Sequence, residues 1–124
     1  QPDAHSGELP CTYVELVEGA DISEAALLEY AHNNISEPGA KPKFLEVLDE
    51  LPKTAVGKVF KPDLRKRAIT RVYNETFEAK QMDAKVVSVE DDKKLGLTAK
   101  INGNASDEEI RAALQDFVGA WVKA

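Results

Sequence analysis

Lys58 has the most unusual surroundings of any charged residue in this 124-residue chain. It follows Gly57 in an apolar stretch without a helix or strand period, between the two breakers Pro52 and Pro62. A lysine in such a loop can point outward as a compact positive charge, and a glycine beside it lets the backbone come close to a ligand. The pair therefore indicates either a contact with an anionic ligand or an ordinary exposed loop lysine.

The Gly-Lys pair is not part of a phosphate-binding P-loop. The pattern G-x-x-x-x-G-K-[ST] would require glycine at position 52 and serine or threonine at position 59, where the chain has Pro52 and Val59. Positive charge does gather around Lys58, because residues 41–67 carry about +4 in a chain of net charge −6. Such a segment can bind a nucleotide or coenzyme A, or it can be a solvated helix face. Its basic residues are Lys41, Lys43, Lys53, Lys58, Lys61, Arg65, Lys66 and Arg67.

The residues around Lys58 resemble the last core motif of the AMP-forming adenylate enzymes. This family comprises acyl-CoA synthetases, the adenylation domains of peptide synthetases, and luciferases. The motif runs L-P-[KR]-T-x-x-G-K, a short spacer and L-R. The chain has LPKTAVGK at residues 51–58, followed by Leu64-Arg65. The run TAVGKVFKP at residues 54–62 is most similar to fatty-acyl-CoA synthetases.

Two further stretches carry the same resemblance. Residues 2–8 are similar to the family's P-D-x-x-x-G-E pattern, and residues 42–50 match its proline, basic residue and strand leading into D-E. The resemblance therefore covers about residues 2–69. One departure is Ala40, which stands where many relatives have a lysine, with Lys41 one place later.

The resemblance implies a fragment of a ligase. Family members use ATP with Mg²⁺ to convert a carboxylic acid into an acyl-adenylate, and a thiol, usually coenzyme A, then displaces AMP. A large N-terminal domain binds ATP and the acid, and a small C-terminal domain alternates between two poses. The chain is similar to that small domain without its hinge and first strand, so we expect it to be inactive alone. Its partners would be the missing N-terminal domain and a carboxylic acid, which the resemblance to fatty-acyl-CoA synthetases makes a fatty acid.

Within this resemblance, Lys58 matches the catalytic adenylation lysine. A mobile ammonium between the carboxylate and the α-phosphate would offset the repulsion between two anions. Gly57, Thr54 and Lys53 would help to bind substrate or cofactor, and no metal ligand is expected in this chain. The alternatives are a peptide-synthetase adenylation domain, a luciferase-like enzyme, or a stand-alone module that binds a nucleotide or another anion.

The composition of the chain argues against several other classes of protein. With 16 basic and 22 acidic residues the chain is a poor candidate for non-specific nucleic-acid binding. It has no apolar run long enough for a membrane span and no secretory leader. The single Cys11 cannot form an internal disulfide. The cytoplasm is therefore the default location, and the start at Gln1 suggests a piece of a larger protein.

Local patterns predict the elements that would position Lys58. Residues 11–17 and 44–48 are predicted strands, because they are short apolar runs bounded by turn signals. Between them, Asp21 and Glu24 form an expected capping box for a helix that ends before Pro38. Residues 51–60 are an expected ordered loop, and a helix starts at Pro62 and runs to about Lys80.

The remaining residues predict a β-β-α extension. Residues 84–90 and 95–101 are predicted strands of a hairpin, with Leu95 at the start of the buried face of the second. Ser106 and Glu109 form another capping box. We expect the last helix to continue through Trp121 on one apolar face.

These elements predict an α+β fold with a small mixed sheet and the order β-α-β-loop-α-β-β-α. We expect two parts, a mobile C-terminal (lid) domain at residues 1–70 and an extension at residues 71–124 that packs on its long helix through Tyr73 and Phe77. The extension is expected to be structural or to contact another subunit, as in a homodimer.

Overall fold

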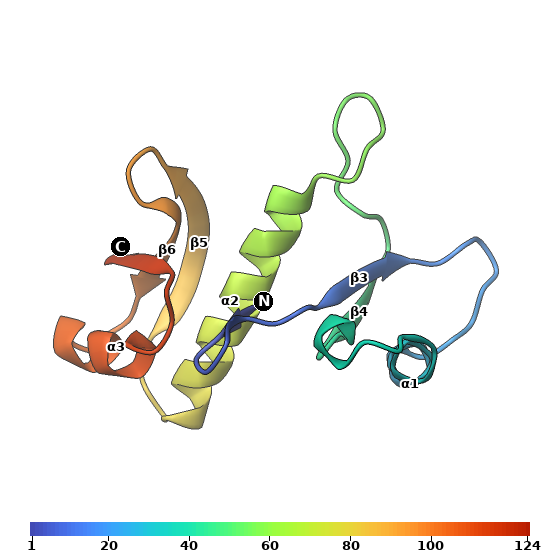
Figure 1. Cartoon of the computed structure of the whole chain (residues 1–124). Coiled ribbons are helices and arrows are strands. Elements are labelled where there is room, and N and C mark those ends of the chain that lie inside the picture. The colour runs from blue at the N-terminus through green and yellow to red at the C-terminus, as the bar shows by residue number, and fades with distance from the viewer. The chain divides into compact units, whose positions relative to one another are not determined.

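The computed structural model describes residues 1–124 and confirms an α+β fold. The chain divides into two compact units, Leu9–Leu64 and a second one made of Gln1–Glu8 with Arg65–Ala124. The boundary falls inside the long helix α2 (Lys61–Ala79), which is continuous in Figure 1. The division into a lid domain at 1–70 and an extension at 71–124 stays a prediction.

The unit Leu9–Leu64 is built on two parallel strands. β3 (Thr12–Glu15) pairs with β4 (Leu45–Leu48), and α1 (Glu24–Asn34) connects them together with the short 3₁₀ helix η1 (Pro38–Ala40). A helical crossover of this kind is what parallel pairing requires. Both strands and the helix were expected from the sequence.

The start of α1 differs from the predicted capping box. Ser23, and not Asp21, is the N-cap, and its hydroxyl accepts the Ala26 N–H at 3.1 Å. Glu24 is the first helical residue, and its carboxylate accepts the Val47 N–H of β4 at 2.8 Å instead of turning back to the cap. A serine caps a helix as well as an aspartate does, so local spacing could not decide between the two positions.

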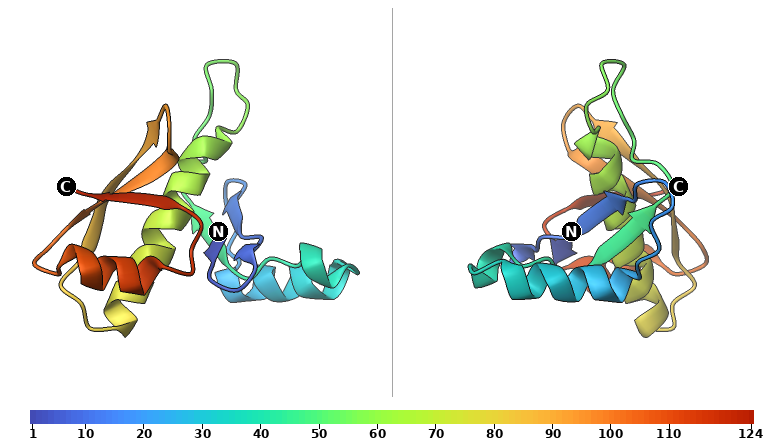
Figure 2. Two further views of the ribbon diagram at one scale, coloured as in Figure 1. Left: turned by 60° about the vertical axis from the view of Figure 1, so that its left-hand side comes forward. Right: turned by 90° about the vertical axis from the view of Figure 1, so that its right-hand side faces the viewer.

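The second unit has the larger core. One face of α2 packs against the sheet of β5 (Lys85–Asp92), β6 (Gly96–Asn102) and β7 (Ala120–Lys123), together with α3 (Asp107–Leu114). Tyr73 and Phe77 of α2 are buried at the centre of this cluster, as expected, and each is only 1% exposed. Figure 2 shows both helices against the sheet.

The predicted end of the last helix is wrong. α3 stops at Leu114, and Trp121 lies in β7, which pairs in parallel with β6 so that Trp121 is opposite Ala99. The spacing of Phe117, Val118 and Trp121 suits a helix, but Val118 is exposed and Gly119 lies against the Tyr73 hydroxyl. A parallel strand partner is a tertiary contact, which no local pattern reveals.

Two further corrections concern strands. Leu95 is 56% exposed in the β5–β6 turn, so the buried side of β6 begins only at Leu97. The predicted order omits three strands, namely β7, β1 (Pro2–Asp3) and β2 (Gly7–Glu8). β1 and β2 form a two-residue antiparallel pair that is too short to give an alternating pattern. The strands form three separate sheets, and the sheet of β5, β6 and β7 is the small mixed one, because β5–β6 is antiparallel and β6–β7 is parallel.

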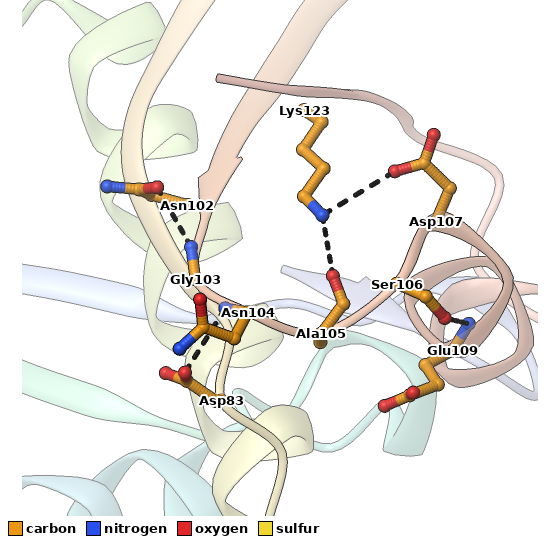
Figure 3. A network of polar contacts seen from close by, with 9 residues as sticks. All are labelled: Asp83, Asn102, Gly103, Asn104, Ala105, Ser106, Asp107, Glu109 and Lys123. Atoms are coloured by element: carbon orange, nitrogen blue, oxygen red, sulfur yellow. Dashed lines mark hydrogen bonds and ion pairs between the residues drawn. The ribbon is translucent and has the colours of Figure 1, made fainter.

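A polar network fixes the junction between β6 and α3 (Figure 3). Ser106 accepts the Glu109 N–H at 3.2 Å, which confirms Ser106 as the N-cap of α3, whereas the Glu109 carboxylate makes no return bond to the Ser106 N–H, so only half of the expected capping box forms. Lys123 of β7 donates to the Ala105 carbonyl at 2.7 Å, so the last strand is fixed to the start of the helix. Gly103 has a φ of +128°, and a Cβ there would overlap the Asp83 carbonyl, so the turn requires glycine.

Candidate functional site

Residues 51–60 form a small hairpin at the entrance to α2. Lys53 and Val59 pair as an antiparallel bridge, the Phe60 N–H donates to the Pro52 carbonyl at 2.7 Å, and the Thr54 N–H donates to the Lys58 carbonyl at 2.7 Å. The hairpin leads directly into α2, which begins at Lys61. The expected ordered loop is therefore confirmed, with more regular pairing than the sequence indicated.

Gly57 allows the hairpin to turn. Its N–H donates to the Thr54 carbonyl at 3.0 Å, which closes a four-residue turn, and its φ of +85° lies in the left-handed region. A glycine in that conformation after a turn is the usual way to close a hairpin loop of this length. The glycine that the motif contains thus shapes the backbone immediately before Lys58.

Lys58 is exposed at the end of this turn. No ion pair or side-chain hydrogen bond of its ammonium is present in the structure. Val56, two residues before Lys58 in the same turn, is 81% exposed. A positive charge on an ordered backbone that makes no ion pair can take an anion from outside this chain. The position therefore fits a phosphate or a carboxylate as its partner.

The other predicted binding residues lie in the same hairpin with different roles. Thr54 is half-buried, and its hydroxyl accepts the Lys58 N–H at 3.3 Å, so its contact is with the backbone that carries Lys58. The Lys53 ammonium lies 3.6 Å from the Glu15 carboxylate. The structure thus brings Thr54, Gly57 and Lys58 together and gives Lys53 an acidic partner. Binding of substrate or cofactor by Gly57, Thr54 and Lys53 stays a prediction.

Glu15 is the residue near the hairpin that sequence reasoning did not single out. It is the last residue of β3, and its carboxylate accepts the Leu51 N–H at 2.8 Å besides facing Lys53. The Leu51 N–H and then Lys53 hold the pKa of the Glu15 carboxyl below its ordinary value. The one signal in the sequence is a charged residue inside the otherwise apolar run CTYVELV at residues 11–17.

The comparison with known families concerns this part of the chain. The AMP-binding enzyme C-terminal domain matches residues 1–58, so the match ends on Lys58. Residues 1–58 belong to this family. The AMP-binding C-terminal domain therefore contains β3, β4, α1 and the hairpin up to its lysine.

Individual relatives are CoA ligases by name. The marinolic acid–CoA ligase of a Pseudoalteromonas species is 39% identical over 115 residues, which are 90% of this chain and 17% of that ligase. A putative acyl-coenzyme A synthetase of Emericella nidulans is 37% identical over 67 residues, or 54% of this chain and 12% of that protein. The peroxisomal trans-cinnamate:CoA ligase of Petunia hybrida is 38% identical over 68 residues, with 54% and 12% covered.

The coverage of these relatives differs in an informative way. The chain spans less than a fifth of the length of each of the three. The alignment with the Pseudoalteromonas ligase has to include most of residues 71–124, whereas the other two match only about half of this chain. The extension beyond the AMP-binding C-terminal domain therefore also has a counterpart in a CoA ligase. No solved structure matches the chain.

No helix of the structure is both long enough and apolar enough to cross a membrane.

Proposed function

We propose that this chain is part of an ATP-dependent acyl-CoA synthetase in which Lys58 promotes formation of the acyl-adenylate. The observation that carries the proposal is the position of Lys58, exposed and without an acidic partner after a glycine turn, in a domain that belongs to the AMP-binding enzyme family. The names of the relatives support coenzyme A as the acyl acceptor.

The chemistry follows from where charge develops. A carboxylate oxygen attacks the α-phosphorus of ATP, the bond to pyrophosphate breaks, and negative charge grows on the α-phosphate oxygens. An ammonium held between the carboxylate and these oxygens lowers their repulsion most in the transition state. The hairpin backbone supplies the ordered position that this effect requires, and Gly57 keeps the backbone beside Lys58 free of a side chain.

The remaining details are part of the same proposal. ATP with Mg²⁺ and coenzyme A would be bound largely by the N-terminal part of the protein, which would alternate against this domain between the two half-reactions. The acid would be a fatty acid, as the TAVGKVFKP run suggests. A panel of acids of different chain length in the thioester assay tests this choice. Location in the cytoplasm stays a prediction, and the Petunia ligase is named as peroxisomal.

Replacing Lys58 tests the proposal. In the full-length protein, Lys58→Ala should slow ATP–pyrophosphate exchange about 10²- to 10³-fold, the usual effect of removing one preorganised electrostatic contact. Thioester formation from preformed acyl-adenylate should change much less, because the lysine acts only in the first half-reaction. Lys80→Ala, an exposed lysine outside the hairpin, is the matched control. Equal loss of both half-reactions in Lys58→Ala would contradict the proposal.

A further inference from the structure

Resting on the function proposed for Lys58, we propose that Glu15 is a positioning residue that fixes the base of the catalytic hairpin to the β3–β4 sheet. Its carboxylate is the acceptor for the Leu51 N–H at 2.8 Å and lies 3.6 Å from the Lys53 ammonium. These two contacts reach the strand of the hairpin that precedes the turn. Glu15 itself lies far from Lys58 in sequence and acts through the backbone between them.

The hairpin needs such an anchor because its own hydrogen bonds are internal. They join Pro52 with Phe60 and Thr54 with Lys58, so they fix the shape of the loop but not its attachment to β4. β4 ends at Leu48, and only Asp49 and Glu50 separate it from Leu51. The Glu15 contact spans this short gap from the neighbouring strand.

Register places Glu15 correctly for this role. In the parallel pair, Glu15 is opposite Leu48, so β3 and β4 end at the same level. The chain that leaves β4 therefore passes the side chain at the end of β3. About a third of the Glu15 side-chain surface is exposed, so the contact is partly solvated. The N–H bond to a carboxylate, which is stronger than one to a neutral acceptor, therefore matters more than the ion pair.

Two substitutions separate the parts of this contact. Glu15→Gln keeps an oxygen that can accept the Leu51 N–H and removes the charge that faces Lys53. Glu15→Ala removes both. We expect adenylation by the full-length protein to fall about ten-fold in Glu15→Ala, because small misplacement of a reacting group is costly, and to fall less in Glu15→Gln. Thioester formation from preformed acyl-adenylate should stay unchanged in both variants.

A second measurement reports on the anchor without using activity. Hydrogen–deuterium exchange followed by mass spectrometry should show faster exchange in peptides covering residues 49–60 of Glu15→Ala, by about ten-fold at Leu51, since the amide loses its charged acceptor. Glu24 offers a matched control in the same unit. Its carboxylate also accepts a backbone N–H, that of Val47 at 2.8 Å, but outside the hairpin. Glu24→Ala should leave exchange at residues 51–60 and adenylation unchanged.

The outcomes separate this proposal from the function on which it rests. Unchanged exchange at residues 49–60 in Glu15→Ala, with Lys58→Ala still impaired in adenylation, overturns the role of Glu15 alone. Faster exchange with normal adenylation in Glu15→Ala overturns it as well. Normal adenylation in Lys58→Ala overturns the proposed function, whatever the exchange shows. Equal adenylation defects in Glu24→Ala and Glu15→Ala would reduce both residues to general stabilisers and overturn the positioning role.

Discussion

A lysine can act on two anions only if its backbone is held in place, and the residues around Lys58 do this with short-range bonds. The Thr54 hydroxyl and carbonyl accept the N–H groups of Lys58 and Gly57, and Gly57 supplies the left-handed conformation of the turn. A side chain at residue 57 would be strained in this conformation. The position of the ammonium thus depends on neighbours that have no charge of their own.

Acidification should remove the contribution of Glu15 to stability. The pKa of its carboxyl is lowered in the folded chain, first by the Leu51 N–H and then by Lys53, from an ordinary value of 4.5. The contribution is therefore complete above the unfolded-state pKa and is lost as the pH falls through the lower folded-state pKa. Urea denaturation of this chain and of Glu15→Gln from pH 7 to pH 3 measures it.

The difference in unfolding free energy between the two proteins should be constant near neutral pH and shrink toward zero on acidification. Asp3 and Asp92 also have lowered pKa values, through N–H groups of Ser6 and Lys94, but both proteins retain them. A difference of the same size at pH 3 as at pH 7 would contradict the assignment.

The residues of the candidate site could be predicted from the sequence only where they are close together in it. Lys58, Gly57 and Thr54 were found because they belong to one contiguous motif. Glu15 was missed because its contact with Leu51 joins residues 36 positions apart. A single sequence gives no indication of which strand end will face which loop.

At the scale of elements, helices and hairpins with local signals were predicted well. α1, α2 and the β5–β6 pair appear where apolar periodicity and turn residues placed them, although the N-cap of α1 is Ser23 and not Asp21. β7 was missed because it pairs in parallel with β6 across α3, a partner that its own four residues do not specify. The same apolar residues satisfy a helical pattern and an edge strand, and tertiary pairing decided between them.

Phe77 and Trp121 are buried to different extents, so we expect their replacement by alanine to lower the free energy of unfolding by different amounts. Phe77→Ala should destabilise the chain by about 3–5 kcal/mol, because Phe77 is 1% exposed in the core. Trp121→Ala should cost less, because Trp121 is only partly buried, in the short edge strand β7. Urea denaturation of both variants measures the two values. A larger cost for Trp121→Ala than for Phe77→Ala would contradict the assignment of Trp121 to the rim of the core.

At the scale of the whole molecule, the proposed reaction needs groups besides Lys58 that this chain would not supply. The chain spans 17% of the Pseudoalteromonas ligase and contains no glycine-rich phosphate loop. We therefore expect no ATP–pyrophosphate exchange by the isolated chain and activity only when the N-terminal part is attached. The exchange assay, run on both proteins at equal concentration, tests this.

Calorimetry on the isolated chain tests the alternative that it is a stand-alone binding module. Micromolar binding of a nucleotide or coenzyme A by residues 1–124 alone would favour a self-sufficient anion-binding module. A homodimer through residues 71–124 also stays a prediction, which the molar mass of the isolated chain in solution can test.

The hairpin around Lys58 also has a consequence for the order of folding. The hydrogen bonds within the hairpin join residues no more than eight positions apart, whereas the β3–β4 pair joins residues 33 apart. Hairpins of this kind form within about 1–10 μs, and pairing between distant segments is slower. We expect the turn that carries Lys58 to close before the sheet beneath it exists. After any local opening the hairpin would regain its shape first, and the contact between Glu15 and Leu51 would form last.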